Sequence, residues 1–234
     1  MNRAILLAVL SLMLSVYAFG KEETIRFLGI PVDGPKSEMI RKLQAKGYEY
    51  VSEEDFFMGF YMGDPVYLFL QVVNEKVSRV IVYDIEQRTE EEIKYRFNSI
   101  YGRFASNRRY ERLGKKNRIL SPEDKLAYEM KRHKYVHKAV FKQVRVDEAD
   151  AEIAKTSAPA VGVRPVDMEQ IKGDYRERRR RMHARAIGYV NRHTTESYKS
   201  QVWFVISERF GKFGVVMLYD NVLNLLANRK APRL

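Results

Sequence analysis

The fold is decided by the apolar stretch Pro65-Val66-Tyr67-Leu68-Phe69-Leu70-Gln71-Val72-Val73 and by one apolar run on each side of it. The neighbouring runs are Phe56 to Met62 and Val77 to Ile85. Gly63-Asp64 and Asn74-Glu75-Lys76 separate the three runs, and residues of these types form tight turns. The spacing therefore predicts an antiparallel meander. Because residues 66–70 are apolar at every position, we expect both faces of the sheet to be at least partly covered.

A similar pair of runs recurs 136 residues later. Placing Val202 to Asn221 over Val66 to Ile85 gives an ungapped match with five identical positions. A helix pattern precedes the paired strands each time, so the simplest interpretation is a duplicated unit. Convergent strand composition would give the same match. The predicted fold class is α+β, with two tandem units of a helix packed on a small antiparallel sheet.

Three further segments have clear local patterns. Thr24 to Ile30 is predicted to be a strand, and a helix from Ser37 ends with Gly47 just past its last turn. Thr89 and Glu92 form a capping box that starts a second helix. The apolar residues of that helix recur at helical spacing and are expected in the core: Ile93, Phe97, Ile100, Tyr101 and Phe104.

The N-terminus has the pattern of a secretory signal peptide. A positive Met1-Asn2-Arg3 start precedes the uncharged apolar stretch Ala4 to Tyr17, and Ala18-Phe19-Gly20 offers small residues for cleavage after Gly20. A membrane anchor is the alternative, but the apolar stretch is shorter than the roughly 20 residues that span a bilayer. We expect a periplasmic or secreted protein whose mature chain has no transmembrane helix.

These patterns divide the chain into a signal peptide (residues 1–20), a first α+β unit (21–86) and a second α+β unit (87–234). The second unit contains an insertion at about residues 147–201, whose composition differs from its surroundings. Ser157 to Pro165 resembles a linker, and Asp167 to Arg185 has the composition of a very basic helix. We expect this insertion to be partly disordered.

The composition excludes several classes of chemistry. The 234 residues include no cysteine, which rules out disulfides, Cys-ligated metal sites and a cysteine nucleophile. A 45% hydrophobic content is that of a folded protein, and 42 Lys and Arg against 30 Asp and Glu give a net charge of +12. Export also makes cytosolic nucleic acid an unexpected partner.

The positive charge is concentrated in the middle of the chain. Residues 21–102 have a net charge of −4, whereas residues 103–145 have +10. Basic side chains there alternate with aromatic ones, and Lys138 and Lys142 continue the pattern, which is typical of polyanion binding. A solvated surface that keeps the protein soluble is the alternative. The candidate polyanion-binding residues are Arg108, Arg109, Arg112, Lys115, Lys116, Arg118, Lys131, Arg132 and Lys134.

No catalytic motif is present in the sequence, and we predict no catalytic residue and no cofactor. Glu129, His133 and His137 are spaced by four, so on one helix they would share a face and offer metal ligands. The cationic neighbours of these residues oppose cation binding, and the alternation after Tyr135 is also compatible with a strand. We therefore predict no metal site.

Three segments resemble a family of uncharacterised exported proteins of Bacteroidota: Phe27 to Gly34, Ser37 to Tyr48, and the hairpin from Val202 to Asn221. The resemblance covers residues 24–145 and 202–221 and implies export, without an activity. The tandem helix-and-sheet arrangement is more distantly similar in architecture to beta-lactamase inhibitor proteins and small outer-membrane assembly lipoproteins. These are interaction modules, so the similarity is one of architecture alone.

The sequence thus predicts an exported, non-enzymatic binding or interaction protein. The expected partner is a protein or a polyanionic envelope component, bound through a sheet face or the basic middle segment. An exported hydrolase acting on envelope or extracellular polymers is the alternative.

Overall fold

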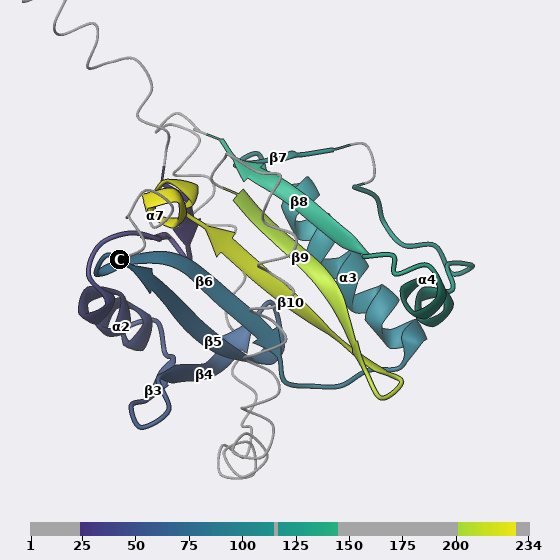
Figure 1. Cartoon of the computed structure of the whole chain (residues 1–234), viewed down its shortest axis with the longest axis horizontal. Helices are drawn as coiled ribbons and strands as arrows, with labels where there is room; N and C mark the ends of the chain where they lie inside the picture. The colour runs from purple at the N-terminus through teal and green to yellow at the C-terminus, as the bar shows by residue number, and fades with distance from the viewer. Residues whose placement is uncertain (1–23, 115–116, 145–200, 228–234) are drawn as a thin grey trace, which may run out of the picture.

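The structure is a computed structural model that describes residues 24–114, 117–144 and 201–227. The described part is mixed α and β, with a large antiparallel sheet and few helices (Figure 1), so the predicted α+β class is confirmed. In chain order the elements are β1 (Arg26–Phe27), β2 (Ile30–Pro31), α2 (Lys36–Gln44), β3 (Glu49–Val51), β4 (Phe56–Tyr61), β5 (Asp64–Val73), β6 (Lys76–Asp84), α3 (Glu90–Ala105), β7 (Tyr110–Arg112), α4 (Leu126–Arg132), β8 (Lys138–Gln143), β9 (Gln201–Arg209), β10 (Lys212–Asp220) and α7 (Val222–Ala227).

The strands from β3 to β10 form one eight-stranded sheet in the order β3-β4-β5-β6-β10-β9-β8-β7. Every neighbouring pair is antiparallel, and the predicted meander is present as β4, β5 and β6. The hairpins β5–β6 and β9–β10 meet at the centre, where β6 pairs with β10. The strands of the two predicted units therefore join in a single sheet rather than in two small ones.

Residues 24–30, predicted as one strand, instead form most of a small hairpin. β1 pairs with β2, and the turn between them places Leu28 and Gly29 at φ values of 51° and 80°. Glycine adopts such a φ without steric cost, which explains why the chain reverses at this point.

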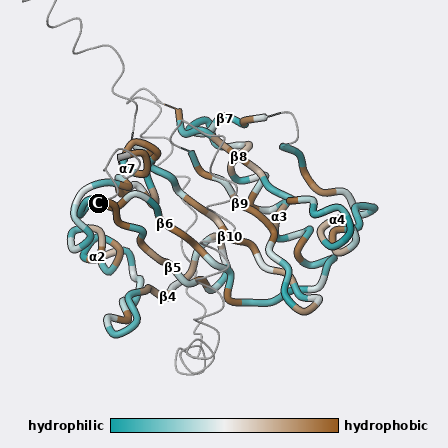
Figure 2. Tube along the Cα trace, in the orientation of Figure 1, coloured by the Kyte–Doolittle hydropathy of each residue, from teal (hydrophilic) through white to brown (hydrophobic). Residues whose placement is uncertain are grey.

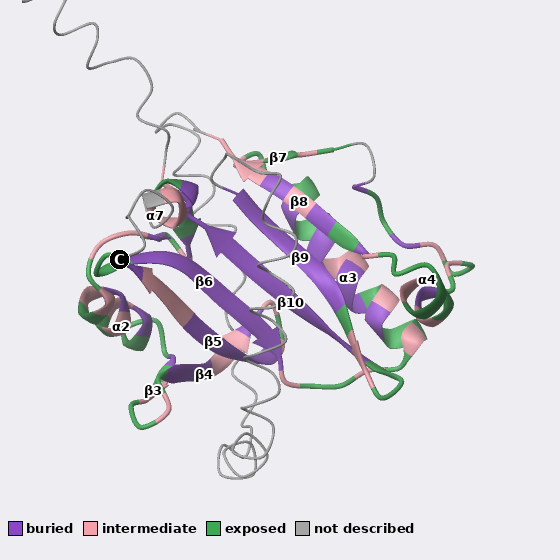
Figure 3. Cartoon of the chain, viewed as in Figure 1, coloured by how far each residue is buried: buried purple, intermediate pink, exposed green. Residues whose placement is uncertain are grey.

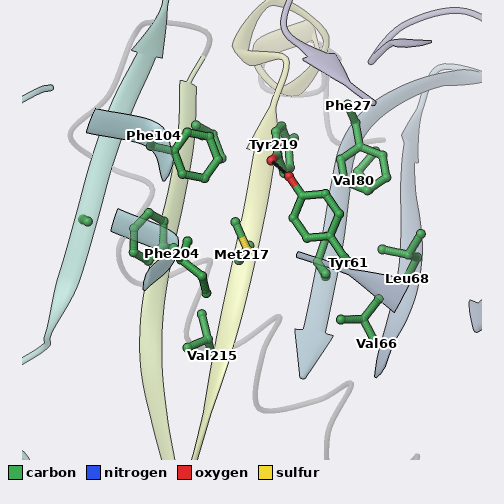
Figure 4. Close-up of a cluster of buried hydrophobic side chains, with 14 of the residues drawn as sticks. Phe27, Tyr61, Val66, Leu68, Val80, Phe104, Phe204, Val215, Met217 and Tyr219 are labelled. Carbon is green, nitrogen blue, oxygen red and sulfur yellow. Dashed lines mark hydrogen bonds between the residues drawn. The ribbon is translucent and has the colours of Figure 1, made fainter. Parts of the chain in front are cut away.

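One face of the sheet, here called the first face, is covered by helices. The side chains predicted for the core side of α3 are all buried there. Phe97 and Phe104 pack on Phe204 of β9, with ring centroids 5.0 and 5.8 Å apart, and Figure 4 shows part of this cluster. The predicted capping box is also present, because the Thr89 amide donates to Glu92 at 2.8 Å and the Glu92 amide donates to the Thr89 hydroxyl.

A buried arginine ties α3 to the sheet. Arg96 is 5% exposed and donates to Asp84 at the end of β6, at 2.9 and 3.1 Å. Its other guanidinium nitrogen lies 2.6 Å from Asp64 at the start of β5. Burial alone would lower the pKa of Arg96, but the two carboxylates raise it above its ordinary value and keep the side chain charged.

The second face of the sheet carries ten buried apolar side chains. They belong to β4, β5, β6, β9 and β10, and the central strands are coloured as buried along most of their length (Figure 3). None of the described helices contributes a side chain to this cluster. The members of this second-face cluster are Phe56, Met58, Tyr67, Phe69, Ile81, Tyr83, Trp203, Val205, Val216 and Leu218.

A β-bulge changes how the two central hairpins correspond. The offset of 136 holds between β5 and β9, where Leu68 and Phe204 both face α3. Between Gln71 and Val72 the pairing of β5 with β6 shifts by one residue, because β6 has an extra residue there. From that point Val82 corresponds to Met217, an offset of 135. The ungapped correspondence predicted from the sequence therefore holds between β5 and β9, but it is wrong by one residue between β6 and β10 beyond the bulge.

The bulge places two aspartates on opposite faces of the sheet, although the sequence match had treated them as equivalent positions. Asp84 faces α3 and binds Arg96, whereas Asp220 lies opposite Arg79 on the second face. A one-residue shift reverses the face to which a strand residue points, so this difference follows directly from the bulge.

Candidate functional site

The predicted basic residues gather along one edge of the sheet, formed by β7, β8 and the end of α4 (Figure 1). The loops around α4 are also mostly hydrophilic (Figure 2). We define the basic edge as Arg108, Arg109, Arg112, Lys131, Arg132, Lys134, Lys138 and Lys142.

These cations form two groups, one at each end of β8. β7 pairs with the C-terminal half of β8, where Arg112 lies opposite Phe141, so Arg108 and Arg109 lie at that end. α4 ends at Arg132, and the chain reaches β8 at Lys138, at the other end. A strand of six residues is about 20 Å long, which sets the approximate separation of the two groups.

Most of these cations have no acidic partner in the part of the chain that the structure describes. Among residues 24–114, 117–144 and 201–227, ion pairs of the basic edge are limited to Lys131, which lies 3.9 Å from Glu208. The remaining seven have no described carboxylate within 4.0 Å: Arg108, Arg109, Arg112, Arg132, Lys134, Lys138 and Lys142. This edge therefore has a positive charge that the described residues do not neutralise.

Three predicted candidates are not part of the basic edge. Arg118 donates to both oxygens of Asp124, at 2.7 and 2.8 Å, and these hydrogen bonds lower the pKa of Asp124 to about 2. The charge of Arg118 is thus offset by its partner. Lys115 and Lys116 lie outside the described residues.

α4 is held in place by the first turn of α3. The Glu90 carboxylate accepts from the amides of Leu126 and Ala127, at 2.6 and 3.4 Å, so it satisfies free donors at the start of α4. Leu126 is fully buried, and Lys94 donates to the carbonyl of Pro122 at 2.7 Å. These contacts position the C-terminal end of α4, which carries one group of cations.

The other group is positioned by polar contacts around the loop after β7. The Asn117 side chain donates to the carbonyl of Val140 at 2.5 Å and to that of Leu113 at 3.2 Å. Arg112 donates to the Tyr101 hydroxyl at 3.3 Å, and this hydrogen bond raises the pKa of Arg112. Both ends of the basic edge are therefore anchored to α3 or β8.

The three weak metal candidates do not lie on one helix. α4 ends before His133, which is exposed and packs edge-on against Tyr128. His137 lies just before β8, with Nε2 3.2 Å from the Glu129 carboxylate. In the part of the chain that the structure describes, no three His, Asp or Glu side chains cluster as metal ligands.

The contact between His137 and Glu129 is the closest approach to an acid-base pair among these candidates. His137 is only 3% exposed, and desolvation lowers its pKa although Glu129 and Asp124 act in the opposite direction. A neutral, buried imidazole has little access to a polymeric substrate. The pair is therefore weak support for hydrolysis.

A buried polar network on the second face was not predicted from the sequence. Asp220 is fully buried and accepts from Arg79 through both carboxylate oxygens, with Arg79 Nη2 2.9 Å from Asp220 Oδ2. Trp203 Nε1 donates to the same carboxylate at 2.8 Å, and Gln71 accepts from Arg79 at 3.2 Å. Arginine and aspartate on separate strands give no local sequence signal of such a pair.

Phe210 is an exposed aromatic residue beside the basic edge that was not among the candidates predicted from the sequence. It occupies the turn between β9 and β10, is 83% exposed, and lies under the guanidinium of Arg209 at 5.3 Å. Glu208 at the same turn approaches Lys131 of α4, so this turn lies beside the basic edge. A bulky aromatic residue next to Gly211 in a turn was the available signal.

Comparison with protein-family models, with curated proteins and with solved structures found no match to this chain. The resemblance to exported Bacteroidota proteins stays a prediction. No helix in the described ranges is both long and apolar enough to cross a membrane.

Proposed function

We propose that this chain is an exported, non-enzymatic binding protein that binds a linear polyanion of the cell envelope along its basic edge. The observation that carries the proposal is the row of seven cations without a described acidic partner. Surface cations are normally interspersed with acids, as they are on α2, where Lys42 pairs with Glu38 at 2.6 Å. A row of cations that no described carboxylate pairs with supports an anionic ligand along this edge.

The arrangement of the cations favours a polymer over a small anion. The two groups lie about 20 Å apart along β8, so a single phosphate contacts only one of them. A chain of regularly spaced phosphates or carboxylates contacts both groups, and the second contact is then intramolecular. Affinity is therefore expected to rise with polymer length.

Two further inferences accompany this function. Export rests on the signal-peptide pattern of residues 1–20. Duplication is supported by the shared element order, since α2 precedes β3 to β6 and α3 precedes β7 to β10. If the two halves arose by duplication, their charges have since diverged. The first half carries the acidic residues Glu53, Glu54 and Asp55 at its β3–β4 end, whereas the second half carries the basic edge.

A pair of matched charge reversals tests the proposed edge. Arg132→Glu with Lys134→Glu changes one group of the basic edge, and Arg41→Glu with Lys46→Glu makes the same change in net charge at α2. Binding of long-chain polyphosphate and of tripolyphosphate is measured by calorimetry at several salt concentrations. We expect the edge variant to weaken long-chain binding by about tenfold or more, because each contact contributes roughly 0.2–1 kcal/mol and reversal adds repulsion.

The α2 control distinguishes binding of the polyanion at the basic edge from its general attraction to the net positive charge of the protein. The α2 variant is expected to lose no more than about threefold, through the smaller net charge alone. Equal losses in the two variants, or equal affinity for long and short phosphate, would contradict the proposed edge. Binding that persists in high salt would instead indicate a protein-like, apolar interaction.

Hydrolysis of envelope polymers is the second predicted function. The contact between Glu129 and His137 is the observation in its favour, weakened by the burial of His137. Turnover of an envelope polymer that is lost in Glu129→Gln and His137→Gln, but kept in Arg132→Glu, would support it.

A further inference from the structure

We propose that the polyanion bound at the basic edge is an acidic polysaccharide, and that Tyr128, Tyr135 and Phe210 pack against its sugar rings. This inference rests on the proposed function and deepens it, because it names the chemical class of the polymer. The three residues are here called the aromatic patch. The predicted insertion at about residues 147–201 lies outside the described residues, apart from Gln201 at the start of β9, and is no part of this patch.

The aromatic patch consists of side chains that the fold leaves open to solvent. Phe210 is 83% exposed, Tyr128 56% and Tyr135 39%. In the described ranges, Tyr95 on α3 is the one other exposed aromatic side chain of this kind. Single exposed apolar side chains are ordinary, but a group of them beside one charged site indicates a binding surface.

Two rings of the patch come from α4 and from the β9–β10 turn, which lie at the same end of the sheet (Figure 1). Tyr128 lies on α4, one helical turn before Lys131. Lys131 Nζ is 3.9 Å from the carboxylate of Glu208 on β9, and Phe210 follows Glu208 by two residues. The contact between Lys131 and Glu208 therefore brings the two rings to one surface.

Tyr135 reaches the same surface because the chain reverses after α4. Lys134 has a φ of 53°, and the Tyr135 amide donates to the carbonyl of Glu129 at 3.1 Å. The carbonyl of His137 accepts from the Ile206 amide at 3.0 Å, which continues the pairing of β8 with β9 towards the β9–β10 turn. Tyr135 therefore lies where α4 meets the end of β9 that leads to this turn.

Cations lie between and beside the three rings. Lys131, Arg132 and Lys134 are exposed and occupy the stretch between Tyr128 and Tyr135. The guanidinium of Arg209 lies 5.3 Å from the centre of the Phe210 ring. The surface therefore alternates flat rings with positive charges, which matches a polymer that alternates flat rings with negative charges.

The rings distinguish a polysaccharide from a chain of phosphates alone. The face of an aromatic ring carries a partial negative charge, so it does not attract a phosphate or a carboxylate. The C–H groups on the flat side of a sugar ring are weakly positive and pack against that face. An acidic polysaccharide offers such rings to the patch and its carboxylates to the neighbouring cations.

A single-stranded nucleic acid also combines anions with flat rings. The signal-peptide pattern of residues 1–20 favours the polysaccharide, because an exported protein meets the glycans of the envelope. The nucleic acid is therefore a competing outcome of the experiment.

Two variants separate the rings from the charges. The ring variant is Tyr128→Ala with Phe210→Ala, and the charge variant is Arg132→Glu with Lys134→Glu. Tyr95→Ala is the matched control, because it removes an exposed ring from outside the basic edge. Calorimetry measures the binding of polygalacturonate, which carries a carboxylate on each sugar ring, of long-chain polyphosphate and of oligothymidylate. The urea midpoint of each variant checks that the fold is kept.

We expect the ring variant to weaken polygalacturonate binding by about tenfold or more and polyphosphate binding by less than about twofold, since only the sugar loses contacts. The charge variant should weaken the binding of both polymers. Tyr95→Ala should change neither affinity by more than about twofold, because it lies apart from the site. Phe210→Trp keeps a flat ring and should bind polygalacturonate at least as tightly as the original chain.

Three results would overturn the proposed polysaccharide. The original chain binds polyphosphate but not polygalacturonate, or the ring variant keeps the original affinity for polygalacturonate. The ring variant weakens the binding of both polymers equally, which would mean that the rings shape the site without contacting sugar. Oligothymidylate binds more tightly than polygalacturonate and loses this affinity in the ring variant, which would identify a single-stranded nucleic acid as the ligand.

Failure of the proposed function gives a different result. If the charge variant binds polyphosphate as tightly as the original chain does, the basic edge is not the binding site and both proposals fail. If the charge variant loses polyphosphate binding while the ring variant keeps polygalacturonate binding, the basic edge stands and only the contact with sugar rings is excluded.

Discussion

Removing the carboxylate of Asp220 should destabilise the protein more than almost any other single change on the second face. In Asp220→Ala the Arg79 guanidinium, only 2% exposed, loses both of its bonds to the carboxylate and keeps one contact to Gln71 at 3.2 Å. The indole N–H of Trp203 loses its acceptor as well. The variant therefore leaves one buried charge and one buried donor without their main partner.

The magnitude follows from these losses. Breaking a buried ion pair by removing one partner costs about 3–5 kcal/mol, and an unsatisfied buried donor costs about 1–3 kcal/mol. The two costs overlap, because a water that enters for Arg79 also reaches the indole. We expect a loss of about 4–5 kcal/mol in the free energy of unfolding, which corresponds to a fall of about 2 M in the urea midpoint.

The assay is urea unfolding followed by far-ultraviolet circular dichroism, because the emission of Trp203 itself changes with its acceptor. Asp55→Ala is the matched control, since Asp55 forms a surface ion pair with Lys36 and its side chain is 52% exposed. That change should cost no more than about 2 kcal/mol, because it removes a surface ion pair from a residue whose φ is 59°, where alanine is less favourable than aspartate. The contrast between the two Asp→Ala variants compares a fully buried carboxylate with an exposed one.

A double replacement tests the reasoning further. Arg79→Met with Asp220→Leu removes both charges and should recover most of the stability, to within about 1–2 kcal/mol of the original chain. If Asp220→Ala costs less than about 1 kcal/mol, or if the double variant is as unstable as Asp220→Ala, the account of an unpaired buried charge is wrong.

Three other predictions concern separate parts of the chain. Glu90→Ala should cost about 1 kcal/mol and increase proteolysis around α4, because the amide of Leu126 loses its acceptor, whereas an unchanged cleavage rate would contradict this role. Burial lowers the pKa of His137 below its ordinary 6.5, so stability should be complete above that pH and fall as the pH drops towards the folded-state pKa; His137→Gln should flatten this dependence in urea midpoints measured from pH 7.5 to 5. Gly59→Ala should cost about 1–3 kcal/mol in thermal unfolding, because its new Cβ would lie 2.5 Å from the ring of Tyr48, and an unchanged midpoint would show that this ring moves freely.

Local patterns predicted much of the fold correctly. The capping box at Thr89 and the apolar stripe of α3 depend on residues close in sequence, so they are readable without tertiary information. The same is true of the existence of α2, although it ends at Gln44 with Ala45 as its C-cap, and Gly47 at φ 86° lies in the turn that follows rather than directly after the helix. The strands of the meander were likewise bounded by recognisable turn residues.

The features that were missed depend on contacts across the sheet. The bulge after Gln71 adds one residue to β6 and moves Asp84 and Asp220 to opposite faces, although both follow a Tyr in matching sequence. The partners Arg79 and Asp220 are 141 residues apart, and nothing near either residue identifies the other. The sequence predicted the basic edge only as a set of basic residues in the middle of the chain. Its division into two groups follows from the placement of β7 and α4 at opposite ends of β8.

The two outermost strands also affect how copies of the protein behave in a crowded solution. An eight-stranded sheet could extend indefinitely by adding strands from other molecules, but β3 and β7 are only three residues long. Beyond β7, the backbone of β8 is already occupied at Val140, whose carbonyl accepts from Leu113 and Asn117. Lys138 places a charge on the rest of that strand. Edge strands that are short, charged or already hydrogen-bonded disfavour the addition of strands from other copies. This wide sheet is therefore protected from polymerising through its edges.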